Sequence, residues 1–175
     1  MKLLVLPQLR QTYNYDCGSK ATESVLVYYG LDVRGDEIIK LESTTKSGTR
    51  IKNIKEVICR YGLKVKSGKM SIQDLKKYID KKVPVMIALQ AWTNKKNIDW
   101  KKNWSDGHYA VVVGYTKDKI IFEDPAAFNY TYLTYSELAD RWHDIDTSGK
   151  KYFNFGMAIF GKKPKFKKRK LIHMD

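Results

Sequence analysis

The sequence predicts one α+β domain, with helices in its N-terminal half and an antiparallel sheet in its C-terminal half. Helix-like spacing of apolar residues dominates as far as residue 81, whereas short apolar runs typical of strands dominate residues 83–160. This order disfavours a repeated βαβ arrangement. The chain has 175 residues, 43% of them hydrophobic, so it can bury a substantial core within a single domain.

A short strand is expected at the N-terminal end. Residues 2–6 are mostly apolar, and Pro7 ends the run. The run is shorter than the apolar stretch of a secretory signal, which needs about 7–15 residues. No apolar run in the sequence approaches the roughly 20 residues that span a membrane. We therefore expect a cytoplasmic protein without a membrane span.

Four helices are predicted ahead of most of the sheet. In the first, Ala21 and Val25 recur at helical spacing, and Gly30 provides a stop. Ser71 and Asp74 have the spacing of a capping box and open the last of the four. The four ranges are residues 17–29, 36–41, 51–61 and 71–81.

The remaining apolar runs predict strands. Lys117 and Asp118 form the turn of a hairpin, because apolar runs flank them on both sides. The expected strands are residues 2–6, 63–66, 83–89, 108–115, 120–123 and 153–160, with one more helix at residues 134–143.

A connection of about 17 residues, residues 91–107, separates two of these strands. It contains Trp92, Trp100 and Trp104 among polar residues. It is long for a connection, so it is either a functional loop or a surface excursion that the tryptophans hold against the core.

The two cysteines do not form a disulfide framework, although a single Cys17–Cys59 bridge is open. Cys59 falls within the apolar pattern of the predicted helix at residues 51–61, so we interpret it as a small buried hydrophobic residue. No cysteine and histidine residues have the spacing of a zinc site, and no glycine-rich phosphate loop occurs. We therefore expect neither a metal nor a cofactor.

The formal net charge of +14 has two interpretations. Residues 162–175 hold seven of the 33 basic residues and one of the 19 acidic ones, so we expect a domain of residues 1–161 followed by a basic, flexible tail. Such charge is typical of a nucleic-acid partner or of a solvated lysine-rich surface. No aromatic residues interleave the basic run as in a binding motif, which favours the solvated surface.

Cys17 is the candidate nucleophile, because it begins the first predicted helix. The first backbone N–H groups of a helix are unpaired, and the helix dipole places partial positive charge there. Both effects favour the thiolate, which is the nucleophilic form of cysteine.

A thiolate nucleophile needs a base, and the base needs an orienting group. His108 opens a strand, and the predicted hairpin brings Asp124 to the same end of the ribbon. We expect the two to be cross-strand neighbours with Cβ atoms about 5 Å apart, so that the carboxylate holds one ring nitrogen and leaves the other for the thiol. His173 lies in the basic tail. His143 and Asp144 are interpreted as helix-end residues, with a second polar site as the alternative.

Two further residues lie just before the predicted nucleophile. Gln11 carries an amide that could join the backbone N–H of Cys17 in stabilising an oxyanion. Asp16 directly precedes the helix, and we expect its side chain to cap the helix start.

The order of these motifs resembles a known family. Gln11, Asp16-Cys17-Gly18, the strand that begins at His108, and Asp124-Pro125 are similar to the papain-like cysteine peptidases of the C39 class. That class includes the bacteriocin-leader processing peptidases and their stand-alone relatives. The resemblance covers nearly the whole chain, and residues 135–144 also look like the stand-alone members.

The resemblance implies a papain-like α+β fold in which a helical half carries Cys17 and a sheet half carries His108 and Asp124. It implies hydrolysis of a peptide or protein substrate through a thioester on Cys17, without a metal. In this scheme His108 acts as base and then acid, and Gln11 helps form the oxyanion hole. The alternative is a catalytically silent module of the same fold that only binds peptides.

Overall fold

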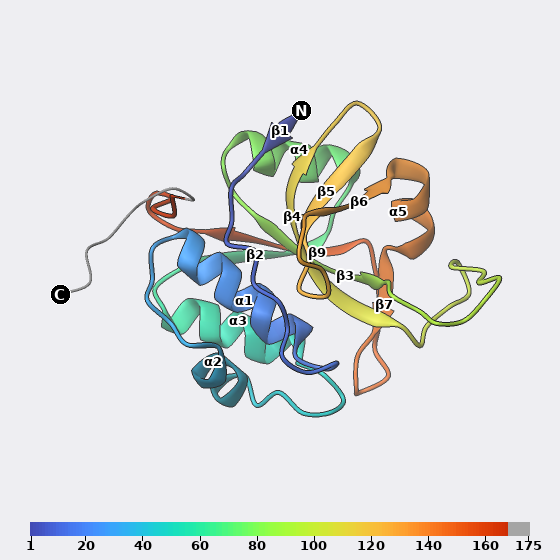
Figure 1. Ribbon diagram of the computed structural model, residues 1–175, viewed down its shortest axis with the longest axis horizontal. Coiled ribbons are helices and arrows are strands. Elements are labelled where there is room, and N and C mark those ends of the chain that lie inside the picture. The colour runs from blue at the N-terminus through green and yellow to red at the C-terminus, as the bar shows by residue number, and fades with distance from the viewer. Residues whose placement is uncertain (168–175) are drawn as a thin grey trace.

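Three N-terminal helices gather beside an antiparallel sheet in the computed structural model, which describes residues 1–167 (Figure 1). This arrangement confirms the predicted α+β class; residues 168–175, and His173 with them, lie outside the described residues. The helices are α1 (Cys17–Tyr28), α2 (Gly35–Leu41), α3 (Ile51–Arg60), α4 (Ile72–Asp80) and α5 (Tyr135–Arg141). The strands are β1 (Lys2–Leu3), β2 (Lys64–Lys69), β3 (Val85–Gln90), β4 (Gly107–Tyr115), β5 (Lys119–Glu123), β6 (Thr131–Thr134), β7 (His143–Ile145), β8 (Lys151–Phe153) and β9 (Phe155–Phe160).

The main sheet has seven strands, and every hydrogen-bonded pair in it is antiparallel. Six strands follow the order β2-β9-β3-β4-β5-β6, and β1 pairs with β4 beside this path. Strands β7 and β8 form a separate two-stranded ribbon. All six residues of β3 are buried, because this strand lies between β9 and β4 with helices near it. Its near-continuous apolar run is typical of such a central strand.

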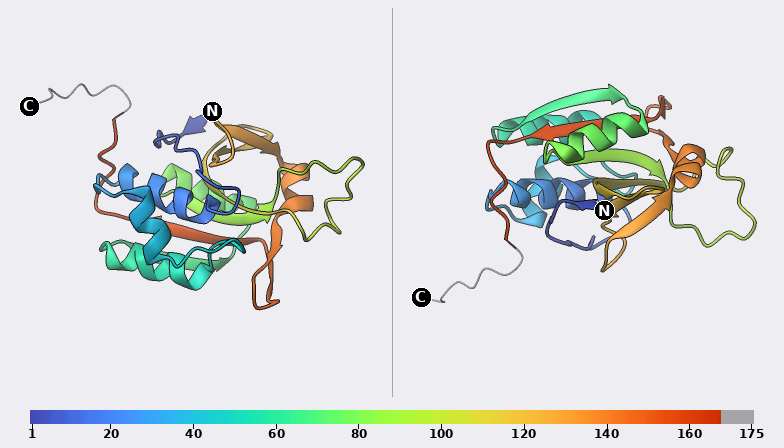
Figure 2. Two further views of the ribbon diagram at one scale, coloured as in Figure 1. Left: turned by 60° about the horizontal axis from the view of Figure 1, so that its bottom comes forward. Right: turned by 90° about the horizontal axis from the view of Figure 1, so that it is seen from above.

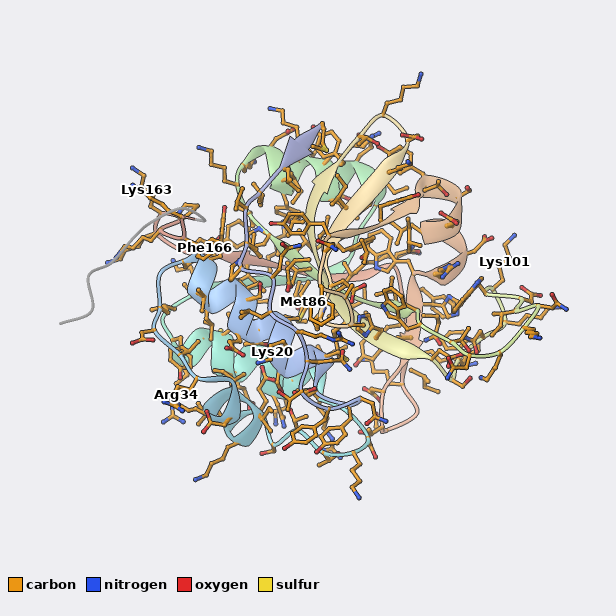
Figure 3. The ribbon with its side chains drawn as sticks, viewed as in Figure 1. Lys20, Arg34, Met86, Lys101, Lys163 and Phe166 are labelled. Carbon is orange, nitrogen blue, oxygen red and sulfur yellow. The ribbon has the colours of Figure 1, made fainter. Side chains whose placement is uncertain are left out.

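The core lies between α1 and the centre of the sheet. Val25 and Leu26 of α1 are fully buried, as is Val111 of β4, the strand against which α1 packs. Met86 of β3 lies near the middle of the molecule (Figure 3) and is also fully buried. Packing against the sheet therefore holds α1, and with it the helix start at Cys17, in a defined place.

A β-bulge interrupts the pairing between β4 and β5. Near the turn Gly114 pairs with Ile121, but on the far side Val112 pairs with Phe122, so Val113 is an extra residue in β4. The carbonyl of Val113 accepts a hydrogen bond of 2.7 Å from the backbone N–H of Leu4, just after β1. The N-terminal segment thus uses a backbone group that β5 leaves free at the bulge.

Several predicted elements differ from the observed ones. The last helix ends at Arg141 rather than near residue 143, because Trp142 bonds its indole Nε1 to the carbonyl of Phe155 and the chain continues into β7. Strands β6, β7 and β8, which have three or four residues each, were not predicted from the sequence. The capping box at Ser71 and Asp74 is confirmed.

The interpretation of Cys59 as a buried residue is wrong, because its side chain is exposed. Helix α3 buries Ile51, Ile54 and Ile58, which share one helical face, and Cys59 projects from the opposite side. Both cysteines of the chain lie within the described residues, and neither forms a disulfide.

The connection between β3 and β4 protrudes from the body of the molecule (Figure 2). Lys101 lies on its protruding part (Figure 3) and forms an exposed ion pair of 3.4 Å with Asp140 of α5. The guanidinium of Arg141 covers the Trp100 ring at 3.9 Å, and Trp104 packs 4.4 Å from the His143 ring. Two of the three tryptophans therefore hold this loop against α5 and β7.

The described part of the basic C-terminal segment returns toward α1 after β9. The backbone N–H groups of Lys165 and Phe166 both donate to the carbonyl of Tyr28, at 3.0 and 3.2 Å.

Among the helices of residues 1–167, none combines the length and the apolar character that a membrane crossing requires.

Candidate active site

Cys17 is the first residue of α1, as predicted, and its side chain is only 8% exposed. The first backbone hydrogen bond of the helix runs from Lys20 N to Asp16 O, so the N–H of Cys17 precedes the helical ladder. The sulfur lies beside a cleft of about 360 Å³ that Cys17 helps to line. The thiol thus lies at the unpaired, positively polarised end of a helix and borders open space.

Asp16 occupies the N-cap position, but its side chain does not cap the helix. The buried carboxylate instead accepts backbone hydrogen bonds from Thr12 and Tyr13, at 3.1 and 2.9 Å. The expected capping role is therefore wrong. These hydrogen bonds hold the loop before α1 in a tight turn that leads directly to Cys17.

His108 of β4 and Asp124, the residue after β5, meet directly. The Nε2 atom of His108 lies 2.8 Å from Oδ1 of Asp124, and both side chains are buried. Because Nε2 faces the carboxylate, the other ring nitrogen remains for Cys17, which lies near enough to raise the pKa of this ring. The structure therefore brings three of the four predicted residues together: His108 and Asp124 are hydrogen-bonded, and Cys17 lies beside the imidazole.

The sequence predicts that His108 and Asp124 lie directly opposite each other, but in the structure they do not. Val111 pairs with Glu123, so Asp124 continues the register opposite Ala110 and lies diagonally across from His108. The side chains still meet because residues two apart on a strand share one face.

Asp124 is held by four hydrogen-bond donors. Besides His108, its Oδ1 accepts the backbone N–H of Ala126 at 2.9 Å. Its Oδ2 accepts Nε1 of Trp92 and Oγ1 of Thr131, both at 3.0 Å. Burial raises the pKa of Asp124, but these donors and the charge on His108 outweigh it and leave the pKa below its usual value. Asp124 is therefore a well-oriented carboxylate.

The charge on His108 follows from the same contacts. Burial of the ring lowers its pKa, whereas the negative charge of Cys17 and the hydrogen bond with Asp124 raise it. The raising effects win, and the pKa reaches about 10. At neutral pH the site therefore favours the protonated imidazolium form of His108.

Gln11 lies close to this group through its backbone. Its N–H donates to the carbonyl of Pro125, the residue after Asp124, at 2.9 Å. Its side-chain Nε2 donates to the carbonyl of Tyr13 at 2.8 Å, and its Oε1 is buried without a hydrogen-bond partner among the described residues. Within the described residues, no hydrogen bond joins the Gln11 amide to Cys17. One of the two N–H bonds of this amide is taken by Tyr13, which leaves the second for another acceptor.

The cleft beside Cys17 has one wall from the helical half and one from the sheet half. On the helical side it is lined by the segment around Gly48, Thr49 and Arg50, and on the sheet side by Tyr109, Asp144 and Trp104. Trp104 forms part of the wall, and the cleft beside it remains open.

Trp92 was missed as a site residue, and a second polar site was only the alternative to the preferred helix-end role of Asp144. Trp92 appeared only as a loop aromatic, although its indole bonds Asp124. Asp144 was interpreted as a helix-end residue, and that interpretation is wrong because the carboxylate lies on β7 and lines the cleft. His143 is not a helix-end residue either, because it lies on β7 and its Nε2 donates to the carbonyl of Asn103 at 2.7 Å. No local pattern marks these roles, because they depend on how β7 packs beside β3 and β4.

Within residues 1–167, no three or more histidine, cysteine or acidic side chains are arranged to hold a metal ion. The polar groups beside Cys17 are those of His108, Asp124 and the cleft residues described above.

This α+β fold, with a cysteine at a helix start facing a histidine and an aspartate from the sheet, is that of the papain-like cysteine peptidases. Residues 6–147 match the family model described as the peptidase C39 family. The chain therefore belongs to the peptidase C39 family. No curated protein sequence gave a significant match.

Solved structures of C39 peptidases share the fold. A C39-like peptidase from Bacillus anthracis is 15% identical with a TM-score of 0.69, covering 94% of this chain and 100% of its own. The peptidase domain of Streptococcus ComA, a bifunctional ABC transporter, is 21% identical with a TM-score of 0.64, covering 93% and 100%. A double glycine motif protease from an AMS/PCAT transporter, solved with its leader peptide, is 19% identical with a TM-score of 0.66, covering 93% and 94%.

Proposed function

We propose that this protein is a cysteine peptidase that hydrolyses a peptide bond through a thioester on Cys17. The observation that carries the proposal is the hydrogen-bonded pair of His108 and Asp124 beside Cys17, which lies at the start of a buried helix. A nucleophile, a base and an orienting carboxylate in this order are the groups that acyl transfer requires.

In the first half of the reaction the Cys17 thiolate attacks the carbonyl carbon of the scissile bond. A C–S bond forms, and the carbonyl electron pair moves onto oxygen. When this intermediate collapses, the C–N bond breaks and His108 gives its proton to the leaving amine. In the second half His108 takes a proton from water, the resulting hydroxide displaces the thiolate, and the acid product leaves. Asp124 keeps the ring oriented throughout.

The developing oxyanion needs hydrogen-bond donors at the start of α1. The backbone N–H of Cys17 is one donor, because it lies ahead of the helical ladder. We assign the second donor to Gln11, whose amide retains one N–H beyond its bond to Tyr13. This assignment requires the Gln11 amide to turn toward the substrate carbonyl when the peptide binds.

A peptide is the substrate class that the family relationship favours. A C39 relative has been solved with a leader peptide, which supports a peptide ligand for the present cleft. The catalytically silent alternative keeps the same cleft but lacks turnover.

The test is digestion of a randomised peptide library by the wild-type protein and by Cys17→Ala. We expect cleavage by the wild type and none above background by Cys17→Ala. Exposed Cys59 also reacts with thiol reagents, so iodoacetamide labelling of Cys17 belongs in a Cys59→Ser background. That variant is expected to keep full activity. If peptides bind but no cleavage occurs with wild-type protein, the silent alternative replaces the proposal.

A further inference from the structure

The cleft beside Cys17 contains a carboxylate that the proposed reaction does not use. Asp144 lies on β7, and its Oδ1 accepts hydrogen bonds of 2.9 Å from Nε2 of Gln90 and from the backbone N–H of Ile145. Gln90 is fully buried, and its amide also donates to the carbonyl of His143. The orientation of Asp144 is therefore fixed by neutral groups of β3 and β7.

The second carboxylate oxygen of Asp144 is available to a ligand. Among the described residues no donor bonds Oδ2, and no lysine, arginine or histidine lies within 4.0 Å of the carboxylate. Burial is the main cause that raises the pKa of this group, to about 6, so it is mostly ionised at neutral pH. The charge of nearby His108 favours the ionised form only in part, and no cation bonds the carboxylate directly, so a positively charged ligand would further compensate this half-buried anion.

Asp144 also lies beside the reacting groups. A Cβ atom on Gly107 would fall 2.6 Å from Oδ1 of Asp144, and Gly107 directly precedes His108. Glycine at this position is thus what lets the carboxylate approach the start of β4. The cleft that Asp144 lines is the one that Cys17 borders.

The other charged residues of the cleft have different surroundings. The Oδ1 atom of Asp146 accepts hydrogen bonds from Ser148 and from the backbone of Lys150, and its Oδ2 accepts one from Tyr152. This carboxylate therefore stabilises the turn to which it belongs. Arg50 is exposed and donates to Thr147 across the cleft, and Lys46 is exposed at the edge.

We propose that Asp144 binds a positively charged group of the peptide substrate in the cleft beside Cys17. The cation is a lysine or arginine side chain near the scissile bond, or the free N-terminal amine of the peptide. This inference rests on the proposed function for the identity of the ligand. It assigns Asp144 a specificity role that is separate from the chemistry of His108 and Asp124.

The test measures binding, so it does not depend on turnover. A randomised peptide library is passed over immobilised Cys17→Ala, and the retained peptides are quantified for lysine and arginine against norleucine and citrulline at each position. The same library is applied to Cys17→Ala combined with Asp144→Asn, which preserves an oxygen for Gln90 and Ile145. The matched control combines Cys17→Ala with Asp140→Asn, which removes an equal charge from an exposed ion pair outside the cleft.

We expect lysine and arginine to be enriched at one position on Cys17→Ala and on the control, and the enrichment to fall roughly 10- to 100-fold with Asp144→Asn. The strongly basic surface repels cationic peptides in general, so enrichment at one position reports a local contact. Acetylated and free-amine libraries distinguish the two sources: enrichment that survives acetylation identifies a side chain, and enrichment that requires the free amine identifies the terminus.

Two results would overturn the inference. One is equal retention of cationic and neutral peptides on Cys17→Ala, including no retention of either. The other is enrichment that Asp144→Asn leaves unchanged. Failure of the wild-type protein to cleave any peptide would overturn the proposed peptidase activity, but the binding comparison would still decide the role of Asp144.

Discussion

Glu123, next to Asp124, should make the stability of this protein fall as pH rises. Its side chain is 1% exposed, and Oε1 accepts the backbone N–H of Leu9 at 3.2 Å while Oε2 has no hydrogen-bond partner within the described residues. Burial is the main cause that raises its pKa, from 4.5 to about 8. The native state thus holds Glu123 protonated over a pH range in which the unfolded chain has already lost that proton.

The size and sign of the effect follow from proton linkage. Below about pH 4.5 both states are protonated and there is no penalty. As the pH rises the unfolded state is favoured, until the native state also ionises near pH 8. Between about pH 5 and pH 8 the free energy of unfolding should therefore fall by roughly 3 kcal/mol because of this residue. For a chain of this size that corresponds to roughly 6–12 °C in Tm.

Urea denaturation of wild type and Glu123→Gln at several pH values measures this effect. The glutamine keeps an oxygen for Leu9 and cannot ionise, so the variant should lack that part of the pH dependence and be the more stable protein near pH 8. Glu56→Gln is the control, because Glu56 is exposed on α3, and its effect should stay within about 0.5 kcal/mol. Parallel pH profiles for wild type and Glu123→Gln would show that burial of this carboxyl is not what sets the dependence.

Three further variants test the candidate site. Asp124→Asn should lower kcat/KM about 100-fold or more, because it removes the negative charge that supports protonated His108; activity within a few-fold of wild type in a library digestion would contradict the proposed role. Trp92→Phe removes one of the four hydrogen-bond donors to Asp124, so we expect kcat/KM to fall by up to about 10-fold. Because the Trp92 ring is exposed, the urea midpoint should change little. An unchanged kcat/KM would show that this bond is dispensable. Gly107→Ala places a methyl group against Asp144 and should lower the free energy of unfolding by about 1–3 kcal/mol, which a wild-type denaturation midpoint would refute.

Local structure could be predicted where neighbouring residues carry it. The start of α4 depends on hydrogen bonds between Ser71 and Asp74, three residues apart, and these bonds are present as expected. The start of α1 at Cys17 was likewise predicted from the pattern that follows it. Side-chain roles that depend on distant backbone were not predictable. Asp16 bonds Thr12 and Tyr13 instead of capping its helix, and Asp144 depends on Gln90, which is 54 residues away in the sequence.

The sequence by itself determined the α+β class, the helix start at Cys17 and the hairpin that joins the strand of His108 to Asp124. Only the tertiary structure decided that the last two side chains meet. Counted from the turn, where Tyr115 pairs with Ile120, an unbroken ladder would place Asp124 opposite Val111, on the face of β4 away from His108. The bulge at Val113 shifts the register by one residue and turns Asp124 to the face of His108. A single extra residue reverses the face because strand side chains alternate, and its location depends on pairing with the N-terminal segment, where Leu4 takes the carbonyl of Val113.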